Sequence, residues 1–289
     1  MTKRVITGAI LIVAVTLAIY FQGWVLQACL LAAMALSTYE MFGAFKAKGI
    51  RPVQWPAYAF CLFSVLNLSH DAQAISLHFG PEALIFCLAG CMLAAMSVIV
   101  LRGRVDFDAL TASVFPMFYP GLLYVCILKL ANLESRMDAT LALALTFFVP
   151  SMNDCFALLT GLTLGRHKLS PEISPKKTVE GAVGGLAASV FFALLLPVVA
   201  RLLVEHVPGL HAHAHTALPP LWMFALLGLV MGALGQFGDL AASLVKRHCG
   251  IKDFGKIFPG HGGVMDRMDG ILFSSVATLI FFHLKGIYP

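Results

Sequence analysis

The sequence predicts an all-α fold, a polytopic bundle of about nine transmembrane helices with a cytoplasmic N-terminus. The 289-residue chain is 59% hydrophobic and only 12% charged, whereas soluble domains carry about 25% charged residues. Stretches such as residues 5–39 and 139–153 hold no charge at all. A helix needs about 20 apolar residues to cross a bilayer, so these stretches are typical of membrane spans.

Apolar runs between polar breaks place the individual spans. They lie near residues 5–21, 24–43, 56–69, 81–101, 111–130, 139–161, 182–204, 220–242 and 270–285. The third and ninth runs are the shortest, a length that also suits a tilted, partly buried or re-entrant segment. We expect a single integral membrane domain over residues 1–289, with a polar signature region at residues 239–270.

The lysines and arginines are unevenly divided between alternate loops, and cytoplasmic loops collect such residues. Sixteen of the twenty fall on one side if nine spans are counted. The other side holds only Lys129, Arg136, Arg201 and Lys285. We therefore expect a multi-pass protein of the cell inner membrane, whose polar segments at residues 46–51, 165–180 and 246–269 face the cytoplasm.

Several other classes of protein are disfavoured. The seven cysteines lie mostly within apolar runs, so neither a disulfide framework nor a CxxC metal site is expected. The net charge of +5 is modest, and we find no footprint for nucleic acid. Alternating His211, His213 and His215 lie in a loop on the outer side, where a solvated loop is a simpler interpretation than a metal site.

The eighth apolar run continues into a polar pattern that can stay helical. Asp239, Ser243 and Lys246 then share one face, because spacings of four and three residues are those of helical neighbours. An acidic residue within an apolar helix marks a candidate functional site. A simple ion pair between Asp239 and Lys246 explains the same spacing.

A loop rich in glycine and lysine follows, over residues 250–263. Glycine lets backbone N–H groups approach an anion, and lysine adds positive charge, so the loop is typical of a phosphate cradle. Pro-Gly and Gly-Gly are also ordinary turn dipeptides. Asp266 and Asp269 come next, where they either cap the following helix or, for Asp266 together with Asp239, hold Mg²⁺.

A second polar segment, residues 165–181, is richer in chemistry than a connector requires. Lys176, Lys177 and Thr178 are placed to reach a nucleoside triphosphate. Thr178 is equally suited to cap the next helix, with Glu180 near its start, and a basic cluster beside a membrane also attracts anionic lipid. The glycines at 181, 184 and 185 favour close helix packing over nucleotide binding.

These motifs together resemble the signature of the phosphatidate cytidylyltransferase family. The matching residues are Ser243-Leu-Val-Lys246-Arg247, Lys252-Asp253, Pro259-Gly-His261-Gly-Gly and Asp266-Arg267-Met-Asp269. A second block of the family is matched by Asn153-Asp154 and by Ser174-Pro-Lys176-Lys177-Thr178-Val-Glu180-Gly. The family often has Ala-Tyr after its Asn-Asp block, where this chain has Ala157-Leu158.

The resemblance implies an enzyme of the lipid bilayer that uses Mg²⁺ to join CTP to phosphatidic acid, releasing pyrophosphate. By position, Asp239, Lys246 and Asp266 would be catalytic. Asp239 and Asp266 would bind metal, with Asp269 as a further candidate. The residues that would contact substrate are Ser243, Arg247, Lys252, His261, Arg267, Lys176, Lys177 and Thr178.

Two alternatives make distinct predictions. A CTP-dependent kinase of polyprenol or another lipid alcohol would transfer the γ-phosphoryl group instead. A transporter with a cation site at Asp239 would carry ions without CTP, although the long basic loops argue against it. The oligomeric state is open, and a homodimer is one option.

Overall fold

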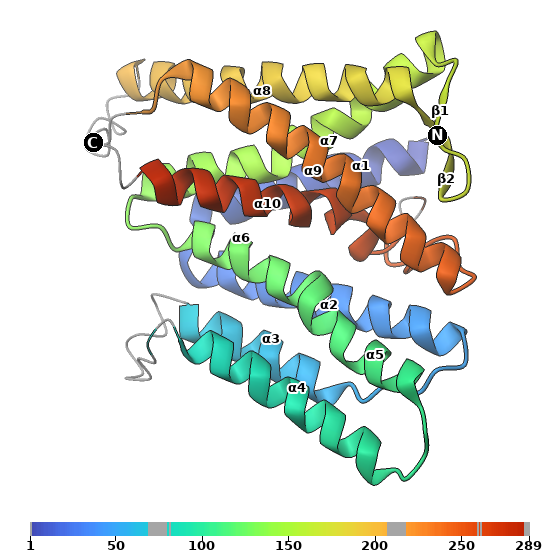
Figure 1. The fold of residues 1–289 in the computed structure, drawn as a ribbon. Coiled ribbons are helices and arrows are strands. Elements are labelled where there is room, and N and C mark those ends of the chain that lie inside the picture. The colour runs from blue at the N-terminus through green and yellow to red at the C-terminus, as the bar shows by residue number, and fades with distance from the viewer. Residues whose placement is uncertain are drawn as a thin grey trace. The chain divides into compact units, whose positions relative to one another are not determined.

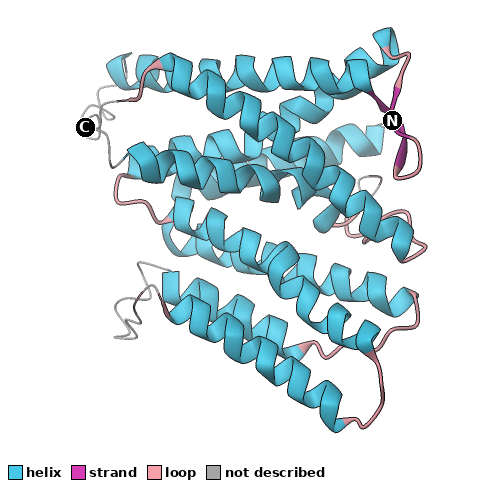
Figure 2. Ribbon diagram, in the orientation of Figure 1, coloured by secondary structure: helices cyan, strands magenta, loops and turns pink. Residues whose placement is uncertain are grey.

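The computed structural model describes residues 2–68, 80, 82–206, 218–258, 260 and 262–285, and most of these are helical (Figures 1 and 2). The helices of the first half are α1 (Thr2–Phe21), α2 (Gly23–Ala47), α3 (Trp55–Leu68), α4 (Ala83–Leu101), α5 (Phe107–Pro116), η2 (Met117–Leu122) and α6 (Leu123–Ala131). The second half has α7 (Arg136–Leu164), the strands β1 (Lys168–Ser170) and β2 (Ser174–Thr178), and then α8 (Val179–His206), α9 (Leu221–His248) and α10 (Met265–Lys285). The predicted helical membrane fold is confirmed.

Seven helical stretches of the described residues are long and apolar enough to cross a membrane. They are Gly23–Ala47, Ala83–Leu101, Phe107–Ala131, Arg136–Leu164, Val179–Leu202, Leu221–His248 and Met265–Lys285. Shorter apolar helices cover Ile12–Phe21 and Trp55–Leu68. A helix therefore stands at each predicted span, while the count of nine crossings and the orientation of the N-terminus stay predictions.

The last helix is longer than the apolar run at residues 270–285. Helix α10 begins at Met265 and is 21 residues long. Asp266 and Asp269 lie at the start of this helix, and both are buried. A buried carboxylate is tolerated where donors surround it, which the sequence alone does not reveal.

The fifth predicted span is interrupted. A π-helical segment, Met117–Leu122, separates α5 from α6, and it contains Pro120. Proline lacks an N–H and cannot continue the regular hydrogen-bond ladder, so a local wider turn is its expected consequence. Asp106 caps the start of α5 by accepting a hydrogen bond from Ala109 N at 2.8 Å.

The chain folds as two compact units. Unit 1 comprises Met1–Leu128 and Val245–Met268, and unit 2 comprises Lys129–Leu244 and Asp269–Pro289. In unit 1, α3 runs beside α4 (Figure 1), and Phe42, Ala57 and Met117 pack in a buried cluster with the small Ala95. The expectation of one membrane domain stays a prediction.

Unit 2 is built on the hairpin of α7 and α8, which lie side by side. A Cβ added to Gly184 would overlap the side chain of Thr160, and one added to Gly185 would overlap that of Asn153. The glycines thus let the two helices approach closely, as the small-residue interpretation predicts.

A short antiparallel hairpin, β1–β2, joins α7 to α8, and the sequence analysis did not foresee it. Lys168 pairs with Thr178, and Ser170 pairs with Ser174. The strands hold only three and five residues, and they lack the alternation of apolar and polar residues that predicts a strand. The hairpin holds Lys176 and Lys177 on an ordered backbone.

Candidate active site

Helix α9 remains helical to His248, as its sequence pattern suggests. Asp239, Ser243 and Lys246 therefore occupy successive turns of one helix. Ser243 and Lys246 are buried, whereas Asp239 is partly exposed. Their spacing does not produce an ion pair between Asp239 and Lys246, because each has a different partner of opposite charge.

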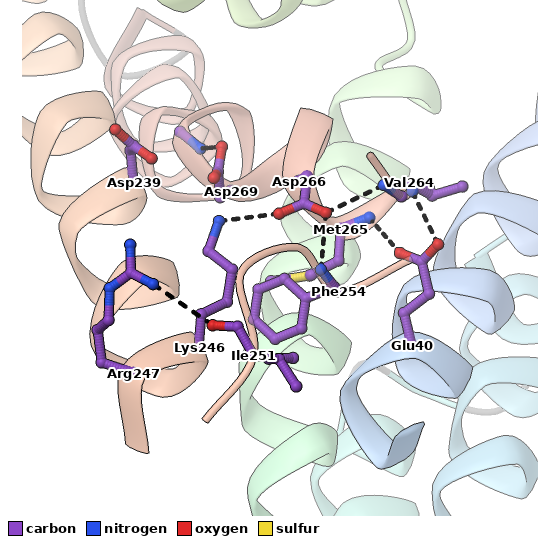
Figure 3. Close-up of polar contacts among 12 residues, drawn as sticks. Glu40, Asp239, Lys246, Arg247, Ile251, Phe254, Val264, Met265, Asp266 and Asp269 are labelled. Atoms are coloured by element: carbon purple, nitrogen blue, oxygen red, sulfur yellow. Dashed lines mark hydrogen bonds and ion pairs between the residues drawn. The ribbon is translucent and has the colours of Figure 1, made fainter. Parts of the chain in front are cut away.

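Lys246 forms a buried ion pair with Asp266 at the start of α10 (Figure 3). Its Nζ donates to Oδ1 of Asp266 at 2.8 Å, and the side chains are 11% and 4% exposed. The same Nζ lies 5.4 Å from the centre of the Phe254 ring, within range of a cation–π contact. The charge of Lys246 is thus held in place from two sides.

The second carboxylate oxygen of Asp266 holds the loop between α9 and α10. Its Oδ2 accepts hydrogen bonds from Phe254 N at 2.8 Å and from Gly263 N at 3.0 Å. Phe258 N in turn donates to Gly262 O at 2.9 Å. Asp266 therefore joins the two halves of the glycine-rich loop, a role that the sequence analysis did not assign to it.

Glu40 of α2 is a residue of this site that sequence reasoning missed. It is 3% exposed, and it accepts hydrogen bonds from Val264 N at 3.0 Å and from Met265 N at 2.8 Å (Figure 3). It lies more than 200 positions before the loop. The one available signal was an acidic residue within an apolar helix, the same signal that singled out Asp239.

A cavity of about 370 Å³ opens between the end of α2 and the loop. Its lining includes Tyr39, Lys46, Asp253, Phe254 and Lys256. Lys46 and Lys256 contribute two basic side chains and Glu40 and Asp253 two acidic ones, so the lining holds both signs of charge. The rings of Tyr39 and Phe254 give it apolar surface.

In unit 2, Asp239 pairs with Lys177 of strand β2. The hairpin thereby places Lys177, from the polar segment at residues 165–181, beside Asp239, the first residue of the signature region at residues 239–270. Thr178 accepts a hydrogen bond from Gly181 N at 3.1 Å, so its capping interpretation is confirmed. Glu180 accepts hydrogen bonds from Arg166 N at 3.0 Å and from His167 N at 3.2 Å, which fixes the start of the hairpin.

Asn153 ties together the three helices of unit 2 that surround it. It is 1% exposed, and its Nδ2 donates to Ser189 Oγ and to Gly232 O, both at 2.9 Å. Gln236 Nε2 donates to Asn153 Oδ1 at 3.1 Å and to Ala182 O at 2.9 Å. Gln236 lies one turn before Asp239, so this network joins that part of α9 to α7 and α8.

The remaining predicted site residues differ in their exposure and in their contacts. Lys176, Arg247, Lys252 and Arg267 are exposed, and Arg247 Nη1 approaches Ile251 O at 3.5 Å. Asp269 is buried, lies in the second turn of α10 and accepts a hydrogen bond from Gly270 N at 2.8 Å. His211, His213, His215 and His261 lie outside the described residues.

The carboxylates of the candidate site can be compared with the ligands that Mg²⁺ requires. Within residues 2–68, 80, 82–206, 218–258, 260 and 262–285, no three His, Cys, Asp or Glu side chains gather into a metal cluster. Magnesium does not need one, because it usually takes one or two carboxylates, waters and substrate phosphates. Asp239 has a partly exposed carboxylate beside Lys177, whereas both oxygens of the buried Asp266 are bonded to Lys246 and to the loop backbone.

The model of the cytidylyltransferase family matches residues 2–285, nearly the whole chain. The chain belongs to the cytidylyltransferase family. The match includes α2, both polar blocks and the loop held by Asp266 and Glu40.

Individual relatives in the cytidylyltransferase family carry more specific names. A protein of Bacillus subtilis named phosphatidate cytidylyltransferase is 28% identical over 287 residues, 98% of this chain and 97% of that protein. One of Staphylococcus epidermidis with the same name is 34% identical over 187 residues, 63% of this chain and 64% of its own length. A chloroplastic phosphatidate cytidylyltransferase of Arabidopsis thaliana is 28% identical over 99% of this chain and 72% of its own.

Proposed function

We propose that this protein is a phosphatidate cytidylyltransferase, which converts CTP and phosphatidic acid to CDP-diacylglycerol and pyrophosphate. Membership of the cytidylyltransferase family and the names of the relatives support the reaction class. The observation that carries the proposal is the buried Lys246–Asp266 pair at the base of a glycine-rich loop. Such a loop suits phosphate binding, because its backbone donors and cations face anions without bulky side chains.

The reaction needs no nucleophile from the protein. A phosphate oxygen of phosphatidic acid forms a bond to the α-phosphorus of CTP, and the bond from that phosphorus to the bridging oxygen of the β-phosphate breaks. Pyrophosphate leaves with the electron pair. The two substrates are both polyanions, so the main tasks of the site are to hold them together and to offset their repulsion.

The basic residues carry out the second task. We assign Lys246 to the reacting phosphates, because Asp266 and Phe254 hold its ammonium in a buried position. Lys177, fixed on the hairpin through Asp239, is the corresponding residue of unit 2. We also assign four exposed basic residues to phosphate binding: Lys176, Arg247, Lys252 and Arg267. Ser243, Thr178 and His261 are further candidates for contact with the substrates.

The proposed cofactor is Mg²⁺, for which Asp239 and Asp266 are the candidate ligands and Asp269 a further one. When bound, the ion would neutralise charge on the CTP phosphates. The carboxylates themselves have a task that does not depend on the ion. Asp239 orients Lys177, and Asp266 orients Lys246 and shapes the loop.

The proposed location is the cell inner membrane, with the active site open to the cytoplasm. Nine spans and a cytoplasmic N-terminus would place the signature loop on the side that holds sixteen of the twenty basic residues. CTP is available on that side. A homodimer stays a prediction for the oligomeric state.

Product analysis in proteoliposomes tests the proposal. Purified protein with CTP, phosphatidic acid and Mg²⁺ should form CDP-diacylglycerol and pyrophosphate in equal amounts, measured by mass spectrometry and a pyrophosphate assay. Replacement of phosphatidic acid by diacylglycerol or a polyprenol should abolish the reaction. Formation of CDP and a phosphorylated lipid from either alcohol would support the kinase and refute the proposal.

A further inference from the structure

Glu40 lies in α2, far along the chain from both blocks of the signature. Its carboxylate is nevertheless buried against the signature loop, where the two oxygens accept hydrogen bonds from consecutive backbone groups, Val264 N and Met265 N. No lysine, arginine or histidine among the described residues forms an ion pair with Glu40. The loop backbone is thus its principal partner.

Val264 immediately precedes α10, and Met265 is the first residue of that helix. Backbone N–H groups at a helix start have no partner within that helix, and a side chain that accepts from them stabilises the helix start. A carboxylate is especially suited, because it also complements the positive end of the helix dipole. Glu40 therefore acts as the cap of α10, supplied by a distant helix.

Asp266 and Glu40 accept hydrogen bonds from different backbone N–H groups near the start of α10. Asp266 accepts from Gly263 N, and Glu40 accepts from the next two residues, so two carboxylates bind three successive N–H groups. A Cβ at Gly255 or at Gly263 would overlap the carboxylate of Glu40. Glycine at these two positions is what allows the carboxylate to reach the backbone.

From these contacts we infer that Glu40 is a positioning residue of the proposed site. It fixes the turn from Gly263 to Asp266, and thereby the pair of Asp266 with Lys246, through its hydrogen bonds to the loop backbone. This inference rests on the proposed cytidylyl transfer for its effect on turnover. Its effect on the loop does not depend on that reaction.

The test uses Glu40→Gln and Glu40→Ala, with Ser37→Ala as the matched control. Ser37 is buried one turn earlier on α2 and is hydrogen-bonded to Tyr124 at 2.9 Å, so its loss perturbs the same helix away from the loop. Hydrogen exchange measured by mass spectrometry on ligand-free protein should rise at least tenfold for a peptide over residues 254–268 in Glu40→Ala. Exchange over residues 55–68 should not change.

Turnover provides the second readout. We expect kcat to fall at least tenfold in Glu40→Ala and less in Glu40→Gln, because the amide oxygen keeps one of the two bonds. Ser37→Ala should retain both kcat and the slow exchange of the loop. Equal losses of kcat in Ser37→Ala and Glu40→Ala, or unchanged loop exchange in Glu40→Ala, would overturn the inference.

The two proposals fail in different ways. If wild-type protein forms no CDP-diacylglycerol while Glu40→Ala still loosens the loop, the proposed function is wrong and the structural role of Glu40 stands. If wild-type protein forms CDP-diacylglycerol and Glu40→Ala leaves loop exchange and kcat unchanged, the positioning role is wrong and the function stands.

Discussion

The ion pair between Lys246 and Asp266 permits a quantitative prediction for Lys246→Met. At a separation of 2.8 Å and an effective dielectric constant of about 20, two unit charges attract by about 6 kcal/mol. Desolvation of the two groups offsets much of this attraction. Removal of one partner of a buried pair nevertheless costs about 3 to 5 kcal/mol, because it leaves the other charge uncompensated.

For Lys246→Met we expect the lower end, a loss of about 3 kcal/mol in the free energy of unfolding. Two backbone N–H groups still bond Oδ2 of Asp266 and partly stabilise its charge. The measurement is unfolding by sodium dodecyl sulfate in mixed micelles. Lys256→Met, which removes an exposed lysine of the same loop, is the control and should change stability by less than about 0.5 kcal/mol.

A double-mutant cycle separates the pair from the rest of the loop. Asp266→Asn keeps an oxygen that can accept the two backbone bonds, but it removes the negative charge. The double variant should therefore be more stable than Lys246→Met alone, with an interaction energy of about 2 kcal/mol. A Lys246→Met variant as stable as wild type, or strictly additive effects, would refute the reasoning.

Three further predictions concern other contacts. Asn153→Leu should lower the free energy of unfolding by about 3 kcal/mol in the same assay, since it loses three buried hydrogen bonds worth about 1 kcal/mol each; a change below about 1 kcal/mol would contradict it. Thr178→Ala should cost about 1 kcal/mol through loss of the cap, whereas Thr178→Ser should cost less, and equal losses would count against capping. A cysteine introduced at Lys256, in a cysteine-free background, should react with an impermeant maleimide only from the cytoplasmic side, and the reaction should be slower when CTP and Mg²⁺ are present. Reaction from the outside would contradict the predicted topology. An unchanged rate with CTP and Mg²⁺ would count against nucleotide binding at the loop.

The helices were largely predictable from the sequence because membrane spans depend on a simple property, the length of an apolar run. A helix was found at every predicted span. The helix ends were less predictable than the helices themselves. The last apolar run begins at residue 270, whereas α10 begins at Met265 and includes the buried carboxylates of Asp266 and Asp269.

The sequence analysis singled out Asp239, Lys246 and Asp266, but their pairings could not be predicted. Helical spacing left an ion pair between Lys246 and Asp239 as one of two interpretations. The structure instead pairs Lys246 with Asp266 and Asp239 with Lys177. Partner choice depends on tertiary contacts between segments that are distant in sequence, and helical spacing contains no information about them.

Glu40 illustrates a second limit. Its binding partners are backbone N–H groups, which every residue except proline possesses, so no residue pattern marks the loop as its target. Asn153 was noted only as part of an Asn-Asp motif, and its role in joining three helices required the structure. Residues that organise a site through the backbone are thus the hardest to predict.

The fate of each CTP phosphate tests the central claim most directly. CTP labelled at the α-phosphorus and CTP labelled at the γ-phosphorus are incubated in parallel with the protein, phosphatidic acid and Mg²⁺, and the lipids are extracted. Cytidylyl transfer predicts that α-label enters the lipid fraction and that γ-label remains in water-soluble pyrophosphate. Entry of γ-label into lipid, with α-label left in soluble CDP, would contradict the account.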